Sequence, residues 1–208
     1  MTIKTVNKHE QRTRETRALL LQAAETIFAR DGYEGAELGE IAALAGRTKG
    51  AIYAQFRSKE DIFLVLIEER TRVHRLEMEK VLAKSTTVDD NIAAVRNFYL
   101  ELAEDQTWSL LILEFKLFAI RHPELKKRVQ SLYAGLLSRK DEKRIAEIIG
   151  PAAAGKDAIS RVIAIQTLQP VISALALEAQ LETNFSDKKV VETVANRIFD
   201  ALLEVPRK

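Results

Sequence analysis

The stretch IAALAGRTKGAIYAQF (residues 41–56) contains two short apolar patterns with helical spacing, separated by a glycine. The first pattern ends at Gly46, and the second begins near Thr48 and continues through Ile52 and Phe56, which are predicted to point into a small three-helix core. Two short helices joined by a glycine-containing turn of three or four residues form a helix-turn-helix. In this motif the first residues of the second helix enter the major groove of DNA. The stretch therefore predicts a DNA-binding segment.

The residues after the turn carry side chains that suit contact with DNA. Thr48 supplies a hydroxyl and Lys49 an ammonium group, and both groups can donate hydrogen bonds to phosphate oxygens. Gly50 and Ala51 are small, so the helix can approach DNA closely. The hydroxyl of Tyr53 can reach a phosphate one turn later, and a partly buried position in the core is an equally good interpretation for this residue. Lys49 has little structural reason to occupy its position.

Helices are also predicted on both sides of the motif. Apolar residues recur at spacings of three and four from about 12 to 30, and Gly32 stands where a left-handed residue ends a helix. Ser58 and Asp61 are spaced as a capping box, in which each side chain bonds the backbone N–H of the other residue. A long fourth helix follows this box. We therefore expect a three-helix domain, with the start of the fourth helix, over residues 12–72.

The remaining residues, 73–208, are predicted to form a second helical domain, which makes the protein all-α with about nine helices. The 8 Gly and 4 Pro residues leave little turn chemistry for a many-stranded sheet. Capping patterns place helix starts at Asp89 or Asp90, at Thr107 and at Pro123.

Two C-terminal helices, predicted at about 156–182 and 187–204, differ from the others in their apolar pattern. Apolar residues occur on nearly every side of the first, and the second carries repeated adjacent apolar pairs. A helix that is apolar all round must be covered by more than its own domain. A second copy of the chain is the predicted cover, and a single-chain bundle with two well-buried helices is the alternative.

Composition excludes several classes of function. The chain has no cysteine, which excludes disulfides, zinc–thiolate sites and cysteine nucleophiles. His9, His74 and His122 have no partners at metal-ligand spacing. The segment GPAAAGK (150–156) has the spacing of a phosphate-binding loop, but it follows a helix end instead of a strand, and Asp157 replaces the magnesium-binding hydroxyl. We expect no metal, no cofactor and no catalysis.

The net charge is only +2, so a surface that binds nucleic acid must be a local patch. The first seventeen residues contain five cations and two acids: Lys4, Lys8, Arg12, Arg14 and Arg17 with Glu10 and Glu15. This segment is interpreted either as an arm attracted to phosphate or as an ordinary solubilising terminus. The N-terminus lacks the apolar stretch of a signal peptide, and no membrane-spanning run is expected. The sequence thus favours a cytoplasmic protein without a membrane partner.

The segments TRALLLQAAETIFARDGY (16–33) and LGEIAALAGRTKGAIYAQFRSKEDIF (38–63) resemble the TetR family of bacterial transcriptional regulators, and within it the AcrR-like repressors. A weaker similarity, over residues 113–125, is to a pattern in the family's ligand-binding domain. The resemblance implies an Ω-shaped homodimer of nine-helix chains whose N-terminal modules bind a pseudo-palindromic operator. A small molecule bound in the C-terminal domain would release the homodimer from its operator.

Matched position by position, the resemblance places DNA contacts on eight residues: Arg47, Thr48, Lys49, Gly50, Ala51, Tyr53, Gln55 and Lys59. Three positions depart from the family pattern. Arg47 replaces the usual Val, Gln55 replaces a common His, and Ala36-Glu37 replaces the Thr that often opens the second helix. Affinity for the DNA backbone is therefore expected to depend more on Arg47 and on the basic arm.

The effector pocket is predicted less sharply, from six residues of the C-terminal domain: Phe98, Trp108, Glu114, Phe115, Phe118 and Tyr133. Such a set could bind a hydrophobic compound, and a cationic one through Glu114. The alternative is that these residues form ordinary core, with Glu114 facing solvent beside Lys116.

We predict a homodimeric repressor of the TetR type. The alternatives are an all-α enzyme or small-molecule or lipid-binding protein that uses the cavity, and a helical interaction protein that binds another protein through 36–56.

Overall fold

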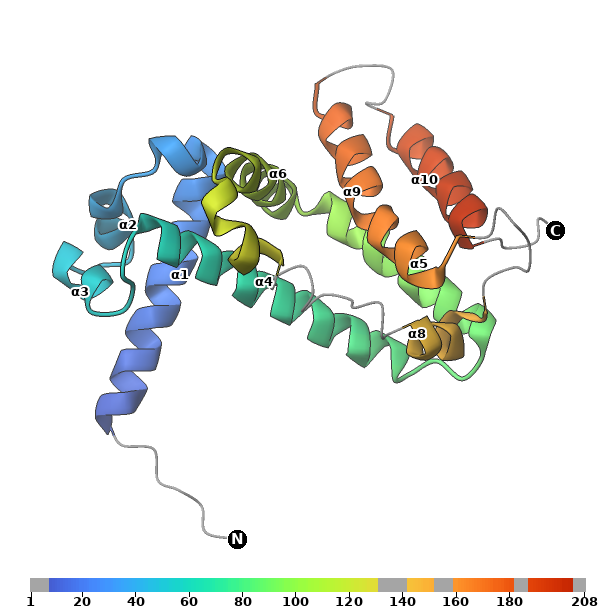
Figure 1. Ribbon diagram of the computed structural model, residues 1–208, viewed down its shortest axis with the longest axis horizontal. Coiled ribbons are helices and arrows are strands. Elements are labelled where there is room, and N and C mark those ends of the chain that lie inside the picture. Colours follow the sequence, from blue (N-terminus) through green and yellow to red (C-terminus); the bar gives the residue numbers. More distant parts are fainter. Residues whose placement is uncertain (1–7, 131–141, 152–158, 182–186, 204–208) are drawn as a thin grey trace, which may run out of the picture. The chain divides into compact units, whose positions relative to one another are not determined.

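The computed structural model describes residues 8–130, 142–151, 159–181 and 187–203. These ranges contain helices and turns and no β-strand, which confirms the all-α prediction (Figure 1). The helices are α1 (Lys8–Gly35), α2 (Leu38–Leu44), α3 (Lys49–Tyr53), α4 (Lys59–Leu82), α5 (Val88–Glu104), α6 (Gln106–Arg121), the 3-10 helix η1 (Pro123–Leu125), α8 (Glu142–Ile149), α9 (Arg161–Ala179) and α10 (Lys188–Leu203).

The chain divides into two compact units whose boundary differs from the predicted one at residue 72. The first unit combines the chain up to Arg70 with the segment Leu110–Arg121 of α6. The second unit combines Thr71–Ser109 with the described residues from His122 onward. The α6 segment belongs to the first unit because its side chains fill the core of that unit, which no periodicity in the sequence could indicate.

The core of the first unit is an apolar cluster with an aromatic centre. Phe63 of α4 lies with its ring centroid 4.8 Å from that of Phe28 on α1 and 5.4 Å from that of Phe118 on α6. The Tyr33 ring lies 4.5 Å from Phe118 and 5.1 Å from Phe63. Burial of each Phe side chain contributes roughly 1.5–3 kcal/mol. These contacts hold three helices, distant in sequence, around one centre.

Several helix starts differ in detail from the predicted caps. Ser58 Oγ accepts from Asp61 N at 3.1 Å as predicted, but the Asp61 carboxylate accepts from Arg57 N instead of Ser58 N. Thr87, not Asp89 or Asp90, caps α5 by accepting from Asp90 N. At the start of α6 the acceptor is Asp105, not Thr107, and Trp108 N is the donor. In each case a neighbouring residue with an equivalent oxygen provides the cap.

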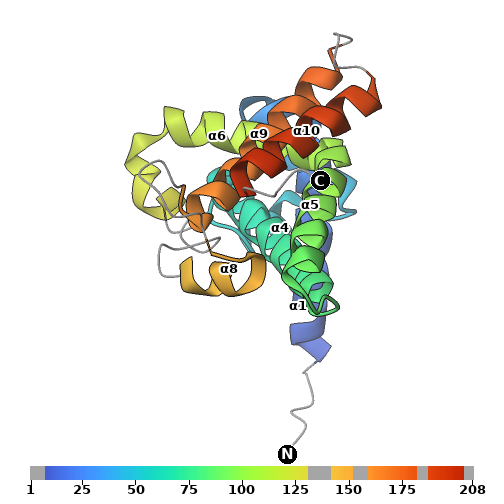
Figure 2. The ribbon, with the colours of Figure 1, turned by 90° about the vertical axis from the view of Figure 1, so that its right-hand side faces the viewer.

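The second unit is built on α9 and α10, which pack side by side against α5 and α8 (Figure 1, Figure 2). Val162, Leu168 and Ile172 of α9 and Phe199 of α10 are buried in its core. Arg96 on α5 donates to Asp200 on α10 at 2.6 Å. By length and composition alone α9 could cross a membrane, as could the core helices of many soluble proteins.

Arg161, at the start of α9, is a buried cation that holds several segments of the second unit together. Its guanidinium donates to the carbonyl oxygens of Gly150 at 3.0 Å, Pro151 at 2.7 Å and Leu203 at 3.0 Å. Arg161 thereby fixes the end of α10 beside the start of α9, because it satisfies carbonyl groups that those chain ends would leave unpaired.

Candidate nucleic-acid interface

The turn between α2 and α3 has the backbone that the sequence predicts for it. Gly46 has φ 63°, in the left-handed region that favours glycine. Its N–H donates to Ala43 O, and Arg47 N donates to Ala42 O, which is the Schellman pattern that ends a helix. A Cβ atom added to Gly46 would meet no atom within 4 Å. The turn is therefore open, and the chain restarts as a helix immediately after it.

The residues that follow present their polar groups outward. Ile52 is fully buried in the core of the first unit, as predicted. Thr48 and Lys49 are exposed, and Thr48 makes no side-chain capping bond to α3. Tyr53 is 56% exposed, so the interpretation of this residue as partly buried core is wrong. Within the described ranges, the side chains of Thr48, Lys49 and Tyr53 have no hydrogen-bond or ionic partner.

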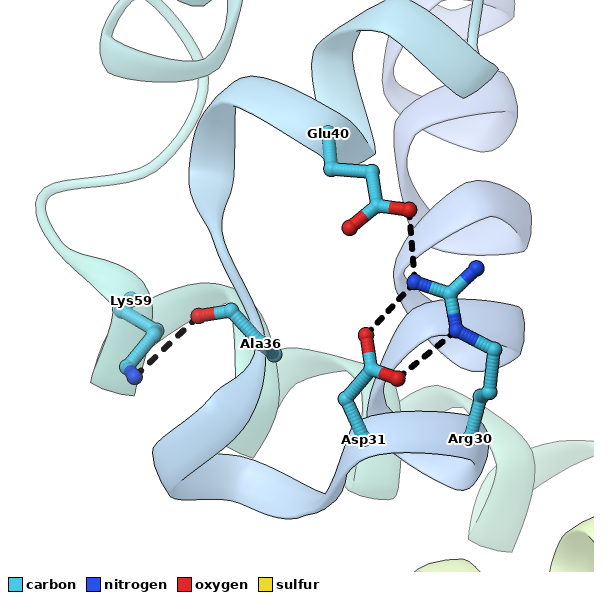
Figure 3. A network of polar contacts seen from close by, with 5 residues as sticks. All are labelled: Arg30, Asp31, Ala36, Glu40 and Lys59. Atoms are coloured by element: carbon cyan, nitrogen blue, oxygen red, sulfur yellow. Dashed lines mark hydrogen bonds and ion pairs between the residues drawn. The ribbon is translucent and has the colours of Figure 1, made fainter.

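Lys59, a predicted DNA contact, has partners inside the protein. Its ammonium group donates to Glu34 O at 3.0 Å. It also donates to Ala36 O at 3.2 Å (Figure 3). The same group lies 4.8 Å from the centroid of the Tyr33 ring. An ammonium group has three N–H donors, so two carbonyls leave one for another acceptor. Its structural role and its predicted contact with DNA are thus compatible.

Two acidic residues and an arginine tie the end of α1 to α2. Arg30 donates to both carboxylate oxygens of Asp31 at 2.7 Å and also pairs with Glu40 on α2 (Figure 3). The hydrogen bonds with Asp31 and then Glu40 raise the pKa of Arg30, and the bonds from Arg30 lower the pKa of Asp31. Arg30 is exposed, so this network contributes to local geometry more than to stability.

Glu114 of α6, predicted for the effector pocket, caps a turn of the first unit. At Gly32 the helix α1 is interrupted, with φ 70° and ψ 176°, and a further turn starts at Tyr33. The Tyr33 N–H therefore lacks an acceptor within its own helix, and it donates to Glu114 Oε2 at 3.0 Å. The surroundings of Tyr33, chiefly its burial and then the charges of Glu60 and Glu34, raise the pKa of its phenol. The carboxylate has a structural partner and does not simply face solvent.

The other predicted pocket residues are distributed over both units. Phe118 lies in the aromatic centre of the first unit, and Phe115 is buried on the same α6 segment. Trp108 is buried in the second unit, with its ring centroid 4.7 Å from that of His74. Tyr133 lies outside the described residues.

Phe98 is one of the residues lining a hollow of about 380 Å³ in the second unit, between the end of α4 and α5. Apolar and charged side chains line the hollow together, including Val81, Lys84 and Glu101. In the part of the chain that the structure describes, no group of three His, Asp or Glu residues could hold a metal ion.

Residues 20–66 match the profile of the family described as "Bacterial regulatory proteins, tetR family". The match includes the whole helix-turn-helix, the open turn at Gly46 and the exposed side chains that follow it. Over residues 20–66 the chain therefore resembles the TetR family.

Two curated relatives each match part of the chain. The chain is 40% identical over 73 residues to the "HTH-type transcriptional regulator AcrR" of Shigella flexneri, which is 35% of this chain and 34% of that protein. It is 25% identical over 119 residues to the "Fatty acid metabolism regulator protein" of Bacillus subtilis (strain 168), which is 57% of this chain and 61% of that protein. The matches thus span between a third and three fifths of these curated relatives.

A solved structure matches the fold of nearly the whole chain. The structure described as "fatty acid degradation regulator FadR from Bacillus halodurans" matches 98% of this chain and 99% of that chain, with a TM-score of 0.68 and 19% sequence identity. This likeness shows the fold alone. The eight predicted DNA-contact residues lie within the family match, whereas the six predicted pocket residues lie outside it.

Sequence reasoning missed one residue of this interface. Arg17 on α1, counted only as part of a basic arm, donates to the backbone oxygen of Gln55 at 3.1 Å. The separation of 38 residues leaves no local pattern that could have revealed the contact.

Proposed function

We propose that the protein is a DNA-binding transcriptional repressor, which binds a pseudo-palindromic operator as a homodimer and is released by a small molecule. The observation that carries the proposal is the set of outward, unpartnered side chains on Thr48, Lys49 and Tyr53, which lies inside the TetR-family match. Polar side chains that follow an open helix-turn-helix can donate to phosphate oxygens and to base edges.

The mechanism separates affinity for the DNA backbone from base recognition. The cations Arg47 and Lys49 would displace counterions from phosphates, so binding would weaken steeply as salt rises. Gly50 and Ala51 would allow close approach of α3 to the groove. Gln55 would add a hydrogen-bond donor and acceptor near the end of the helix. The direction in which the side chains of α3 point would then determine the sequence that is recognised.

A homodimer would place two such modules on the two half-sites of an operator. Support comes from the apolar surface of the last two helices: Ile163 is 52% exposed, and Leu181, just beyond α9, is 69% exposed. Val190 on α10 is also exposed. Large exposed apolar side chains at neighbouring helices favour cover by a partner surface. We propose that a second copy of the chain provides it.

The effector is proposed to be a hydrophobic compound bound in the second unit. Phe98 and Trp108 stay the candidate contacts, since both lie in that unit. Glu114 already accepts a hydrogen bond in the first unit, so a preference for a cationic effector has less support. The name of the Bacillus subtilis relative, a fatty acid metabolism regulator, is consistent with a hydrophobic effector. We propose a cytoplasmic protein without catalytic activity.

Fluorescence anisotropy in a salt series tests the function, with duplexes taken from beside the protein's own gene. We expect nanomolar binding to one duplex and weak binding to the others. Combining Lys49→Ala with Tyr53→Phe should lower the specific affinity by about tenfold or more and reduce the salt slope by about 1. Lys80→Ala, an exposed lysine on α4 in the second unit, is the matched control and should change neither quantity.

Weak binding to every duplex, unaffected by these substitutions, would contradict the proposal. A hydrophobic ligand bound tightly by such a protein would then favour the lipid-binding or enzymatic alternative. Association with another protein, insensitive to salt and to Lys49→Ala, would favour the interaction-module alternative.

A further inference from the structure

Arg17 makes two contacts with the segment that ends the helix-turn-helix. Its Nη1 donates to Gln55 O at 3.1 Å, and its guanidinium carbon lies 4.5 Å from the centroid of the Phe56 ring. Gln55 follows α3 and its cap Ala54 directly, and Phe56 is only 2% exposed. One arginine of α1 thus touches both residues that connect α3 to the core.

Such a contact matters because α3 has only five residues, Lys49–Tyr53. A helix of this length is unstable by itself, so its orientation depends on its neighbours. Ile52 and Phe56 anchor one side of the segment through burial. The carbonyls at the end of a helix lack partners within the helix, and Arg17 supplies one to Gln55.

We propose that Arg17 is a positioning residue for DNA recognition, which fixes the end of α3 and thereby orients Tyr53 and Gln55 toward the DNA. The inference rests on the proposed function of the protein. It differs from the interpretation of Arg17 as one phosphate-binding cation of a basic arm. Arg17 is half-buried, and its guanidinium lies over an aromatic ring and donates to a carbonyl, so it has partners within the domain.

Arg14 provides a matched control on the same helix. It lies three residues before Arg17, is exposed, and has no polar partner among the described residues. A cation in this position can act on DNA only through charge. Substitution of Arg14 and of Arg17 by glutamine removes the same charge, so a difference between the two variants measures the contacts of Arg17 with Gln55 and Phe56.

The first test is DNA binding by the full-length protein, with the selected duplex and a scrambled duplex of equal length. Arg17→Gln is expected to lower the specific affinity about tenfold, to change non-specific affinity less than about twofold, and to leave the salt slope unchanged. Arg17→Lys should not restore specific affinity, because an ammonium lacks the planar group that stacks on Phe56 and reaches Gln55 O. Arg14→Gln should leave the ratio of specific to non-specific affinity unchanged.

The inference is overturned if Arg17→Gln weakens both duplexes equally, reduces the slope by about 0.9, and is rescued by lysine, because that result identifies a phosphate contact. Equal specific binding by Arg17→Gln and wild type also overturns it.

A second test needs no DNA and distinguishes failure of this inference from failure of the proposed function. Hydrogen exchange of the free protein should show faster exchange over residues 52–56 in Arg17→Gln, by about tenfold, and no change in Arg14→Gln. The amides of Gln55 and Phe56 report this directly, since both donate to Ile52 O. Unchanged exchange in Arg17→Gln would refute the positioning role even if the protein binds DNA. Faster exchange without specific DNA binding would support the contact and reject the function.

Discussion

Two turns of the first unit are built on a left-handed glycine, and they differ in what surrounds them. Gly46, with φ 63°, has open space where a Cβ atom would be. Gly32, with φ 70°, has the Glu114 carboxylate 3.1 Å from the position of an added Cβ. The first turn precedes the exposed residues Thr48 and Lys49, whereas the second is enclosed by side chains of α4 and α6.

Under the proposed function, this difference separates the residues that recognise DNA from those that stabilise the domain. At the turn 32–36, three backbone groups bond side chains from other helices. Glu114 accepts from the Tyr33 N–H, and Lys59 donates to the carbonyls of Glu34 and Ala36. At Gly46 the backbone bonds are local, Arg47 donates only to the adjacent Gly46 O, and the side chains of Thr48 and Lys49 stay unpaired. Substitutions at the enclosed turn should therefore affect unfolding, and those beyond the open turn should affect DNA binding.

The strongest test of this comparison is the pair Gly32→Ala and Gly46→Ala. Gly32 has a backbone conformation that is essentially restricted to glycine, and its new methyl group would displace the Glu114 carboxylate, so we expect a loss of about 3 kcal/mol in the free energy of unfolding. Gly46→Ala should lower the free energy of unfolding by only about 1 kcal/mol, because alanine disfavours the left-handed backbone. Urea unfolding followed by circular dichroism measures both values. Equal losses would mean that the enclosure of Gly32 has no energetic consequence.

Glu114→Ala tests the cap separately from the glycine. The variant leaves the Tyr33 N–H without its acceptor, which should cost roughly 1–3 kcal/mol of unfolding free energy. Glu114→Gln keeps an acceptor oxygen and should lose less than half of that amount. Glu37→Ala, which removes an exposed carboxylate of the same unit that makes no side-chain cap to α2, is the control and should change stability very little. If Glu37→Ala and Glu114→Ala lower the free energy of unfolding equally, the bond that Glu114 accepts from the Tyr33 N–H does not stabilise the turn.

How much of the fold and of the candidate site could be predicted from the sequence depends on the distance along the chain between residues in contact. The turn at Gly46, the burial of Ile52 and Phe56 and the exposure of Lys49 follow from local spacing, and they were predicted. Glu114 lies 81 residues from Tyr33. Its apolar neighbours made a pocket the natural interpretation, because periodicity shows that a helix face is buried but not what covers it.

The same limit explains why the capping and domain details differed. Thr87 and Asp105 compete with nearby residues that carry equivalent oxygens, so composition alone does not select the cap. The segment Leu110–Arg121 joins the first unit through side-chain contacts that only the folded chain reveals.

The smallest expected effect comes from two lysines that the family resemblance treats alike. Lys59→Met should cost about 1 kcal/mol of unfolding free energy, because the carbonyls of Glu34 and Ala36 lose a donor but can still bond water. Lys49→Met should change stability by less than about 0.5 kcal/mol, since the side chain is exposed and unpaired. The order should reverse for specific DNA affinity, where Lys49→Met is expected to have the larger effect. Measuring the free energy of unfolding and the DNA affinity of both variants tests whether each lysine of the first unit stabilises the fold or contributes to the proposed DNA binding. A parallel loss of stability and affinity in both variants would mean that the two turns are not separate in function.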